Sequence, residues 1–342
     1  MSAEKPTVRT LAQVTGLSLA TVSRALSGSA SVLPATRERV LSVARELHYV
    51  RDRAALRLKT GKTQVLAFMM DRYDASQPGF KHLMLGISDA TQGTDYHLIV
   101  LPDRPSVDPL SGVRYVVERG LADGLLMSHT TPDDPRVRYL LEQDFPFVTH
   151  GRTRLSQPHA WVDFANEQFA ALGVQALAAR GRRRLAILLP QPGSEFRDHL
   201  GDGFERACAA HGVHGERVLS VSLDDGPEAI YQWARAEAVR FDGIVLSLEA
   251  PALSLLDALA DTQRQPGRDV DVVLKYSSDL PHYIRQPLIV CFEDLHLAGL
   301  TLGRQLLAQL RQAPGAAPQH VLFSPPALEA LHDRSGPERP VP

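Results

Sequence analysis

The segment from Thr7 to Leu26 places two short helical patterns on either side of a tight turn, Thr15-Gly16-Leu17. Apolar residues recur at helical spacing in both patterns, more regularly in the first than in the second. Ser18 stands where a helix N-cap should be, and its hydroxyl can accept a backbone N–H that has no partner within the helix. Gly16 supplies the unusual backbone angle that such a turn demands. This layout predicts a helix-turn-helix, whose second helix enters the major groove of DNA.

The distribution of charge supports a basic, nucleic-acid-binding N-terminus. The whole chain of 342 residues is nearly neutral, with 37 basic against 39 acidic side chains. Residues 1–62 hold 11 Lys and Arg against four acids, a net charge of +7, which leaves −9 on the remainder. Such asymmetry is typical of a polyanion-binding segment joined to an acidic body. A solvated helical face is the alternative explanation, and the coincidence with a helix-turn-helix pattern disfavours it.

A third helix and a short fourth segment follow the predicted pair. The stretch from Pro34 to about Leu47 carries an apolar stripe, and Pro34 suits the first helical position because its missing N–H costs nothing there. Leu33 stands at the expected cap site instead of Ser or Thr, a local weakness of roughly 1 kcal/mol. The helix-capable segment from Arg53 to Leu58 ends at the break Thr60-Gly61-Lys62. It is too short to form a stable helix alone in water.

From Val65 onward, apolar strand-like runs alternate with amphipathic helices. The expected strands are Val65–Met70, Tyr96–Leu101, Gly124–Met127, Phe147–Thr149, Leu185–Leu189, Val218–Leu223, Gly243–Leu248, Val270–Leu274 and Val321–Phe323. The expected helices are Phe80–Thr91, Gly112–Arg119, Asn166–Ala179, His199–His211, Glu228–Val239, Leu253–Leu259 and Leu295–Leu310. Continuous apolar strands separated by helices indicate parallel sheets covered on both faces. Two series of such units, divided around residues 155–165, predict two similar lobes.

Several function classes find no support in the sequence. No apolar signal region follows the first residue, and no run approaches the about 20 apolar residues of a membrane span. Cys208 and Cys291 stand in apolar contexts, which favours buried free thiols in a reducing cytoplasm. Glycine-rich phosphate loops and the H-E-x-x-H, C-x-x-C and G-x-S-x-G motifs do not occur. We therefore expect a cytoplasmic protein that is not an enzyme and has no cofactor or metal site.

The expected topology itself points to a ligand site. In open parallel sheets, ligands bind outside the carboxyl ends of the strands, and a cleft between two lobes is the natural place. Polar residues just past the expected strands are therefore candidates for binding a small effector, with an ordinary surface-loop role as the alternative for each. They are Asp71, Arg72, Tyr73, Ser128 with its neighbour His129, His150 and Arg152 in the first lobe, and Arg197, His199, Ser247, Glu249, Lys275 and Ser277 in the second.

These residues and patterns resemble the lactose-repressor (LacI/GalR) family of bacterial transcription regulators. The likeness rests on Thr7 to Leu26, above all Gly16-Leu17-Ser18 and Thr21-Val22-Ser23-Arg24, then on Thr36-Arg37-Glu38-Arg39-Val40, Leu47-His48-Tyr49 and Ala55 to Leu58. It extends over nearly the full length, because the family body consists of two Rossmann-like lobes of the periplasmic sugar-binding type. Arg51 stands where many members have proline, and Asp52 puts an acid near the phosphates.

The resemblance implies roles in DNA binding for particular residues. Leu19 and Ala20 open the recognition helix and face base edges, and Arg24 can read guanine bidentately, worth about 1–3 kcal/mol of discrimination. Leu58 looks like the hinge leucine that wedges into a central base step from the minor groove. Core packing is the alternative for Leu19 and for Leu58. The positions that contact phosphate, and so set register and not sequence, are Thr7, Thr21, Ser23, Thr36 and Tyr49.

The effector site departs from the family pattern. His150 and Ser277 fall near positions where members often hold a sugar hydroxyl with aspartate, and Ala165-Asn166 replaces an Asp-Asn pair. Aspartate can accept two sugar hydroxyls, which histidine and serine cannot do equally well. A simple monosaccharide pose is therefore disfavoured, and an oligosaccharide, a phosphorylated sugar or another polar metabolite stays open.

The expected architecture is a small all-α helix-turn-helix head with a hinge helix, followed by an α/β body of two Rossmann-like parallel-sheet lobes, periplasmic-binding-protein-like. The expected boundaries are 1–50 for the head, 51–62 for the hinge helix and linker, 63–325 for the body and 329–342 for a disordered tail. Within the body, the first lobe takes about 63–160 and 292–318, and the second about 161–290 and 319–328.

The resemblance implies a repressor that binds a palindromic double-stranded operator as a homodimer and is released by a small sugar-like effector between the lobes. The lack of a C-terminal leucine repeat favours a dimer over a tetramer. Two alternatives remain: a corepressor-dependent regulator that responds to a non-sugar metabolite, and a solute-binding body that carries a basic head without a regulatory switch.

Overall fold

The computed structural model describes residues 6–50, 57, 60–71, 77–103, 108–312 and 316–332. The chain divides into two compact units, residues 1–63 and residues 64–342. The proposed hinge residue Leu58 and the candidates Arg72 and Tyr73 lie outside the described residues. Among the residues described, no helix is long and apolar enough to cross a membrane.

The first unit contains α1 (Val8–Thr15), α2 (Leu19–Leu26) and α3 (Pro34–Glu46). Thr7 and Thr10 form a capping box on α1: the Thr7 hydroxyl accepts the Thr10 N–H at 3.2 Å, and the Thr7 N–H donates to the Thr10 hydroxyl at 3.1 Å. Ser18 caps α2 by accepting the Thr21 N–H at 3.1 Å. Gly16 turns the chain between them with φ of 67°. As expected, Leu33 occupies the N-cap position of α3 and provides no side-chain cap.

A single apolar cluster holds these three helices together. Each helix contributes one fully buried side chain to this cluster: Leu11, Val22 and Val40. Burial of side chains of this kind contributes about 1.5–3 kcal/mol each, which stabilises helices too short to persist alone.

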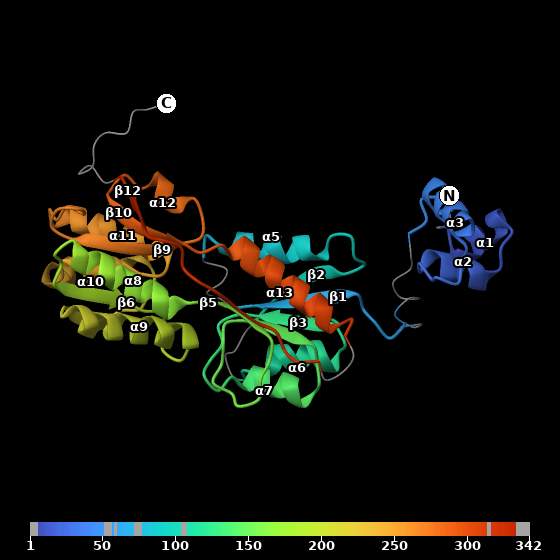
Figure 1. Cartoon of the computed structure of the whole chain (residues 1–342), viewed down its shortest axis with the longest axis horizontal. Coiled ribbons are helices and arrows are strands. Elements are labelled where there is room, and N and C mark those ends of the chain that lie inside the picture. Colours follow the sequence, from blue (N-terminus) through green and yellow to red (C-terminus); the bar gives the residue numbers. More distant parts are fainter. Residues whose placement is uncertain are drawn as a thin grey trace, which may run out of the picture. The chain divides into compact units, whose positions relative to one another are not determined.

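The second unit contains two six-stranded sheets, one in each lobe (Figure 1). The first has the order β11-β5-β4-β3-β1-β2, all parallel, with strands β1 (Val65–Met70), β2 (His97–Pro102), β3 (Gly124–Met127), β4 (Phe147–His150), β5 (Trp161–Phe164) and β11 (His320–Phe323). The second has the order β12-β10-β9-β8-β6-β7, with β6 (Arg184–Leu188), β7 (His214–Val218), β8 (Gly243–Leu246), β9 (Asp271–Tyr276), β10 (Leu288–Phe292) and β12 (Glu329–Leu331). Among the described strands of this sheet, β12 alone runs antiparallel.

Helices cover both faces of each sheet. The first lobe carries α5 (Phe80–Thr91), α6 (Ser111–Glu118), α7 (Pro135–Glu142) and α13 (Leu295–Gln309). The second carries α8 (Asn166–Ala179), α9 (Glu195–His211), α10 (Pro227–Glu237), the 3₁₀ turn η2 (Ala238–Arg240), α11 (Glu249–Asp261) and α12 (Leu280–Tyr283). Because both faces are covered, alternate side chains of β1 are buried on opposite faces of the sheet. Leu66 and Phe68 pack in the apolar cluster with α5 and α13, whereas Ala67 and Met69 pack in the cluster with α6 and α7.

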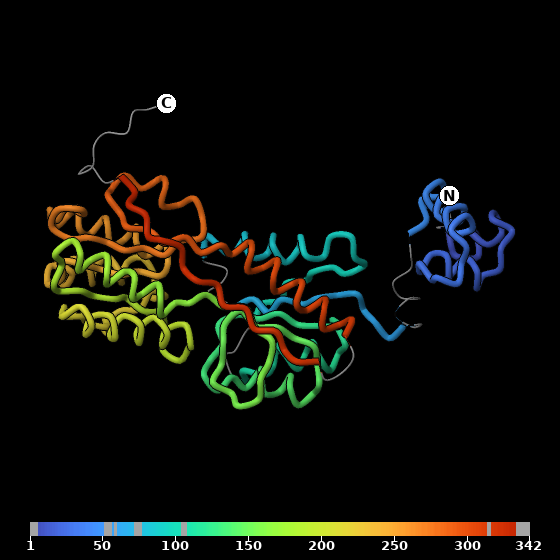
Figure 2. Tube along the Cα trace, in the orientation of Figure 1, coloured from blue at the N-terminus to red at the C-terminus, as the bar shows by residue number. Residues whose placement is uncertain are grey.

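The described chain passes between the lobes after β5, after β10 and after β11 (Figure 2). Two of these crossings differ from the expected lobe boundaries. Residues 161–164 and 320–323 were expected in the second lobe, but β5 and β11 pair with each other in the first sheet. The lobe to which such a short strand belongs depends on the strands with which it pairs, and these partners can lie far away in the sequence.

Other differences also have a physical cause. The strand expected at Val218–Leu223 is instead β7, His214–Val218, at the edge of the second sheet. Its charged residues Glu216 and Arg217 interrupt the apolar pattern by which a strand is recognised. Val221 and Leu223 belong to the loop after β7 and are buried in the core. Residues 329–331, expected in a disordered tail, form β12 because they pair with β10. The elements β5, β10 and α7 were not expected. Cys208 and Cys291 are buried, as predicted, and burial raises their pKa values to about 11 and about 12.

Candidate DNA-binding head and effector cleft

The outer face of α2 presents the side chains expected to read DNA. Leu19 is 49% exposed, and Ala20 and Arg24 are exposed as well. This exposure rules out the core alternative for Leu19, since an apolar side chain on a helix surface does not stabilise the head. The Arg24 Nε donates to the Ala20 carbonyl at 3.3 Å, which holds the guanidinium along the helix.

The five residues expected at phosphate-contact positions lie on or near the surface. Thr7 is exposed, whereas Thr21, Ser23, Thr36 and Tyr49 are half-buried. The Thr7 hydroxyl belongs to the capping box, and the Thr21 hydroxyl lies 2.9 Å from that of Ser18. The caps alone therefore account for a hydroxyl at these two positions, and a phosphate contact stays a prediction.

The second unit contains a cleft between the carboxyl ends of the strands of both lobes. Eight of the expected effector residues line it: Ser128, His150, Arg152, His199, Ser247, Glu249, Lys275 and Ser277. Asp71 does not line it, and Arg197 points elsewhere, because its guanidinium donates to the Pro190 carbonyl.

Several lining residues were not predicted from the sequence. Each lies on or beside an element that was not expected, or that was expected to begin later than it does. Asp163 lies on β5, and Glu293 follows β10. Glu195 opens α9, which was expected to begin at His199. Ser194 is a usable signal there, because its hydroxyl caps α9 by accepting the Arg197 N–H at 3.2 Å.

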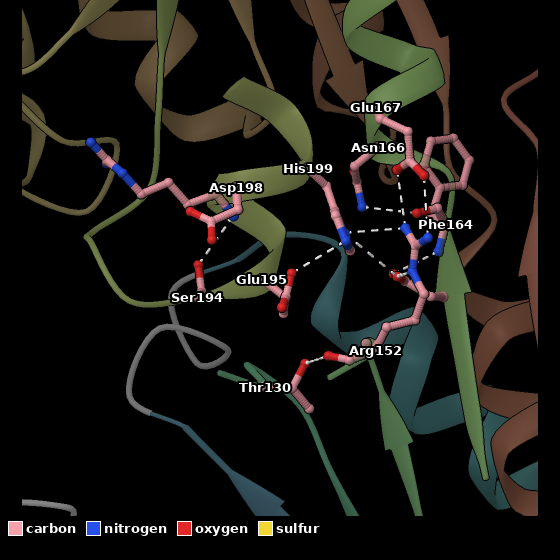
Figure 3. A network of polar contacts seen from close by, with 12 residues as sticks. Thr130, Arg152, Phe164, Asn166, Glu167, Ser194, Glu195, Asp198 and His199 are labelled. Atoms are coloured by element: carbon pink, nitrogen blue, oxygen red, sulfur yellow. Dashed lines mark hydrogen bonds and ion pairs between the residues drawn. The ribbon is translucent and has the colours of Figure 1, made fainter. Parts of the chain in front are cut away.

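Arg152, in the loop after β4, is the centre of a polar network (Figure 3). Its Nε donates to Asp163 Oδ2 at 2.6 Å, and its Nη1 and Nη2 donate to the two carboxylate oxygens of Glu167 at 3.2 and 3.0 Å. Burial opposes charge on both partners, but these hydrogen bonds prevail: the pKa of Glu167 is lowered and the pKa of Arg152 is raised. Asp163 belongs to the first lobe and Glu167 to the second, so Arg152 joins the lobes.

A second set of contacts joins the same loops to α9. Arg154 Nε lies 2.7 Å from Glu195 Oε1, and its Nη2 donates to Asp198 Oδ2 at 2.8 Å. The Glu195 N–H donates to the Thr130 carbonyl at 3.0 Å, and the Thr130 hydroxyl donates to the Arg152 carbonyl at 2.6 Å. Figure 3 shows the Thr130 hydroxyl in contact with Arg152, and the Glu195 side chain in contact with His199.

Lys275 is 5% exposed and reaches the cleft from the end of β9. Its Nζ lies 2.5 Å from Glu293 Oε2 and donates to Asn166 Oδ1 at 2.8 Å. The rings of Phe164 and Phe196 flank the ammonium with centroids at 5.0 and 4.7 Å, a cation–π arrangement. The buried charge is therefore fully matched.

Glu249 and Ser247 follow β8 and differ in their partners. The Glu249 carboxylate accepts the N–H groups of Ser277 and Ser278 and the Ser278 hydroxyl. This pattern makes Glu249 a support for the loop after β9. The Ser247 hydroxyl is buried in the cleft wall, and it has no hydrogen-bond partner within the described part of the chain.

Comparison with family models agrees with this two-part architecture. Residues 7–52 match the model "Bacterial regulatory proteins, lacI family", and residues 63–234 match "Periplasmic binding proteins and sugar binding domain of LacI family". Residues 174–330 match "Periplasmic binding protein-like domain". The chain belongs to the LacI family. LacI-family proteins are transcription regulators with a helix-turn-helix head, so the predicted family and class of function are confirmed.

LacI-family relatives match at moderate identity. The transcriptional regulator RafR of Escherichia coli is 32% identical over 63% of this chain and 64% of its own length. The regulator AglR of Rhizobium meliloti is 26% identical over 98% of this chain and 96% of its own. These proteins are curated as HTH-type transcriptional regulators.

Solved LacI-family structures establish the fold. The lac repressor dimer bound to operator and the anti-inducer ONPF has a TM-score of 0.80 and 19% identity, over 96% of this chain and 99% of that one. The complex of the regulator CelR with cellobiose has a TM-score of 0.66 and 23% identity, over 95% of this chain and 98% of that one. The expected helical head and two parallel-sheet lobes are thereby confirmed.

Proposed function

We propose that this LacI-family regulator is a repressor that binds a palindromic operator as a homodimer. A small sugar-like effector in the cleft between the lobes then releases it from DNA. The observation that carries the proposal is one chain that joins a helix-turn-helix with an exposed reading face to a polar, two-lobed cleft.

The head supports sequence-specific DNA binding. The caps at Thr7 and Ser18 order the turn that leads into α2, while Leu19, Ala20 and Arg24 stay exposed. An exposed guanidinium can meet O6 and N7 of guanine, and exposed apolar side chains can contact a thymine methyl. The net charge of +7 on residues 1–62 favours association with the phosphate backbone.

The cleft supports binding of a small polar effector. Its lining combines aromatic side chains with buried hydrogen-bonding groups, the combination that small-molecule sites share. The relative CelR has been solved with cellobiose, which favours a sugar for this cleft as well.

The release step requires that the effector bind one arrangement of the lobes better than the other. Contacts such as Arg152 with Glu167 and Arg154 with Glu195 cross between the lobes, so a ligand among them can change their relative stability. Couplings of this kind are typically about 1–3 kcal/mol. Leu58, as the residue that couples the body to the operator, stays part of the proposal.

The test is selection of duplexes from a random pool by the full chain, followed by gel shifts with and without sugars. We expect a palindromic consensus, a complex of two chains per duplex, and release by at least one neutral or modified sugar. Affinity should fall with salt by a log–log slope of about −0.9 for each neutralised phosphate. Failure to enrich any duplex contradicts the DNA-binding proposal, whereas binding only in the presence of a metabolite contradicts release and favours corepression.

A further inference from the structure

We infer that the effector of the cleft is an uncharged polyhydroxy compound, and neither a phosphorylated sugar nor a carboxylic acid. The inference rests on the proposed function of the cleft and narrows its ligand class. It follows from how the charged side chains around the cleft are already matched.

The cations at the cleft already pair with carboxylates of the protein. Arg152 and Lys275 are the Arg and Lys side chains that line the cleft within the described ranges. Arg152 directs its Nε at Asp163 and both terminal nitrogens at Glu167, and the contacts with Glu167 can be followed in Figure 3. Lys275 lies against a carboxylate, an amide oxygen and two aromatic rings. A phosphate would have to displace these carboxylates and leave them buried without a counter-charge.

Both ring nitrogens of His199 also face groups of the protein. The Nδ1 atom lies 3.1 Å from Arg152 Nη2 and 4.0 Å from Asp163 Oδ2, and Nε2 lies 3.3 Å from Glu195 Oε2. Two carboxylates therefore already surround this ring, and an anion would have to displace them.

The balance of formal charge in the cleft also opposes an anion. The described lining contains the carboxylates of Asp163, Glu195, Glu249 and Glu293, two more than the cations Arg152 and Lys275. A cleft with an excess of one sign lowers the local concentration of ligands with that sign. The same carboxylates offer little to a cationic ligand, since Glu249 alone already accepts three hydrogen bonds.

What the cleft still offers is a neutral hydroxyl. The Ser247 residue is 3% exposed, lines the cleft, and its Oγ has no partner among the described groups. A hydroxyl both donates and accepts, which matches the hydroxyls of a sugar. Phe196 and Tyr276 add apolar ring surface to the same cleft. The cleft wall can therefore bind a ligand through a hydrogen bond to the Ser247 hydroxyl and through contact with the two aromatic rings.

The test is calorimetry with the full chain and three matched classes of probe. The neutral probes are cellobiose, maltose, melibiose, trehalose and glucose; the anionic ones are the 6-phosphate of each of these sugars, with gluconate as the carboxylate counterpart of glucose. We expect binding by a neutral compound, and at least tenfold weaker binding by its phosphorylated or carboxylate counterpart. Equal or tighter binding of an anionic counterpart overturns the inference and leaves the proposed regulator intact. Binding by no compound of any class overturns the sugar-like effector itself, while duplex selection still reports separately on DNA binding.

A pair of serine variants tests the buried hydroxyl. Ser247→Ala should weaken the best neutral ligand at least tenfold, because the ligand loses its partner in the wall. Ser254→Ala, on α11 and outside the cleft lining, is the matched control and should bind as the unmodified chain does. Circular dichroism and the melting temperature establish that both variants fold. Unchanged affinity of folded Ser247→Ala contradicts the assignment.

Discussion

The helix-turn-helix head and the effector cleft are both polar functional surfaces, but their contacts have a different range along the chain. In the head, the ordering hydrogen bonds join residues three positions apart, as between Ser18 and Thr21. In the cleft, Arg152 reaches Asp163, Glu167 and His199 over separations of 11, 15 and 47 residues. Lys275 reaches Asn166 over 109 residues.

This difference predicts how each region tolerates substitution. The reading side chains of α2 are exposed, so each can be removed without leaving a buried partner behind. The cations of the cleft are paired with carboxylates, and removal of one member leaves its partners buried and unmatched. The head should therefore respond residue by residue, whereas paired residues of the cleft should respond together.

The largest effect is expected for Arg152→Ala, which leaves Asp163 and Glu167 without their shared cation. The Arg152 side chain is 20% exposed and that of Asp163 is 9% exposed, so we expect a loss of about 3 kcal/mol in the free energy of unfolding. The control is Arg138→Ala, because its side chain is 55% exposed and that of its partner Asp133 is 72% exposed, so the loss should stay near 1 kcal/mol or below. Urea unfolding measures both. Equal losses would show that the two arginines contribute alike and that burial does not decide the cost.

Arg24→Ala should change DNA recognition and leave the fold unchanged. We expect the preference for one base pair to fall by about 2 kcal/mol while binding to other positions stays as it was. Competition gel shifts with single-base operator variants measure this. Thr36→Ala should instead weaken binding to all duplexes alike, because a phosphate contact carries no sequence information. The same uniform loss for both variants would refute the division of roles on the head.

Acid should weaken the body through His159. Burial first, and the neighbouring His320 second, lower the pKa of His159 from 6.5 to about 4. Between these two pH values the unfolded chain binds a proton on this residue and the folded chain does not. The contribution of His159 to the free energy of unfolding is therefore fully present above about pH 7 and decreases as the pH falls from 6.5 towards 4. The expected loss from this residue between pH 7.5 and 5.5 is about 1 kcal/mol.

His159→Gln is the matched variant for this test. It keeps a hydrogen-bonding group near Thr149, the partner of His159 Nε2 at 3.0 Å, but cannot take up a proton in this range. Urea unfolding at both pH values should show a smaller pH dependence for the variant. An identical pH dependence would mean that other groups account for the acid sensitivity.

The smallest effect is expected for Ser18→Ala in the head. Loss of the cap leaves the Thr21 N–H without its acceptor and should reduce the stability of the head by about 1 kcal/mol. Thermal unfolding followed by circular dichroism measures it, and Ser18→Asp, which can also cap, should restore most of the loss. No change in Ser18→Ala would mean that packing alone orders α2.

Much of the fold could be predicted from the sequence, because its signals are local. The cap at Ser18, the turn at Gly16 and the apolar stripes of the head located α1 and α2, and continuous apolar runs located β1 and β3. Short or polar elements were harder. The edge strand β7 carries charged residues, and β5 and β10 are defined by the strands beside them.

The cleft could be predicted only in part, for a similar reason. Residues at the carboxyl ends of the strands, such as Ser128 after β3 and Lys275 near the end of β9, were placed in it correctly by topology. Asp163, Glu195 and Glu293 were missed, because their positions depend on elements whose starts or partners the local pattern does not reveal.

By itself, the sequence determined the helix-turn-helix, the alternation of strands and helices, and the family, because each depends on residues a few positions apart. Only the tertiary structure decided which strand belongs to which lobe and which charges in the cleft are matched. From the sequence alone, Arg152 could equally be an unpaired cation that binds an anionic ligand. Its partners on β5 and α8 come within hydrogen-bond distance only when the two lobes have formed, and that neutralisation sets the chemistry the cleft can accept.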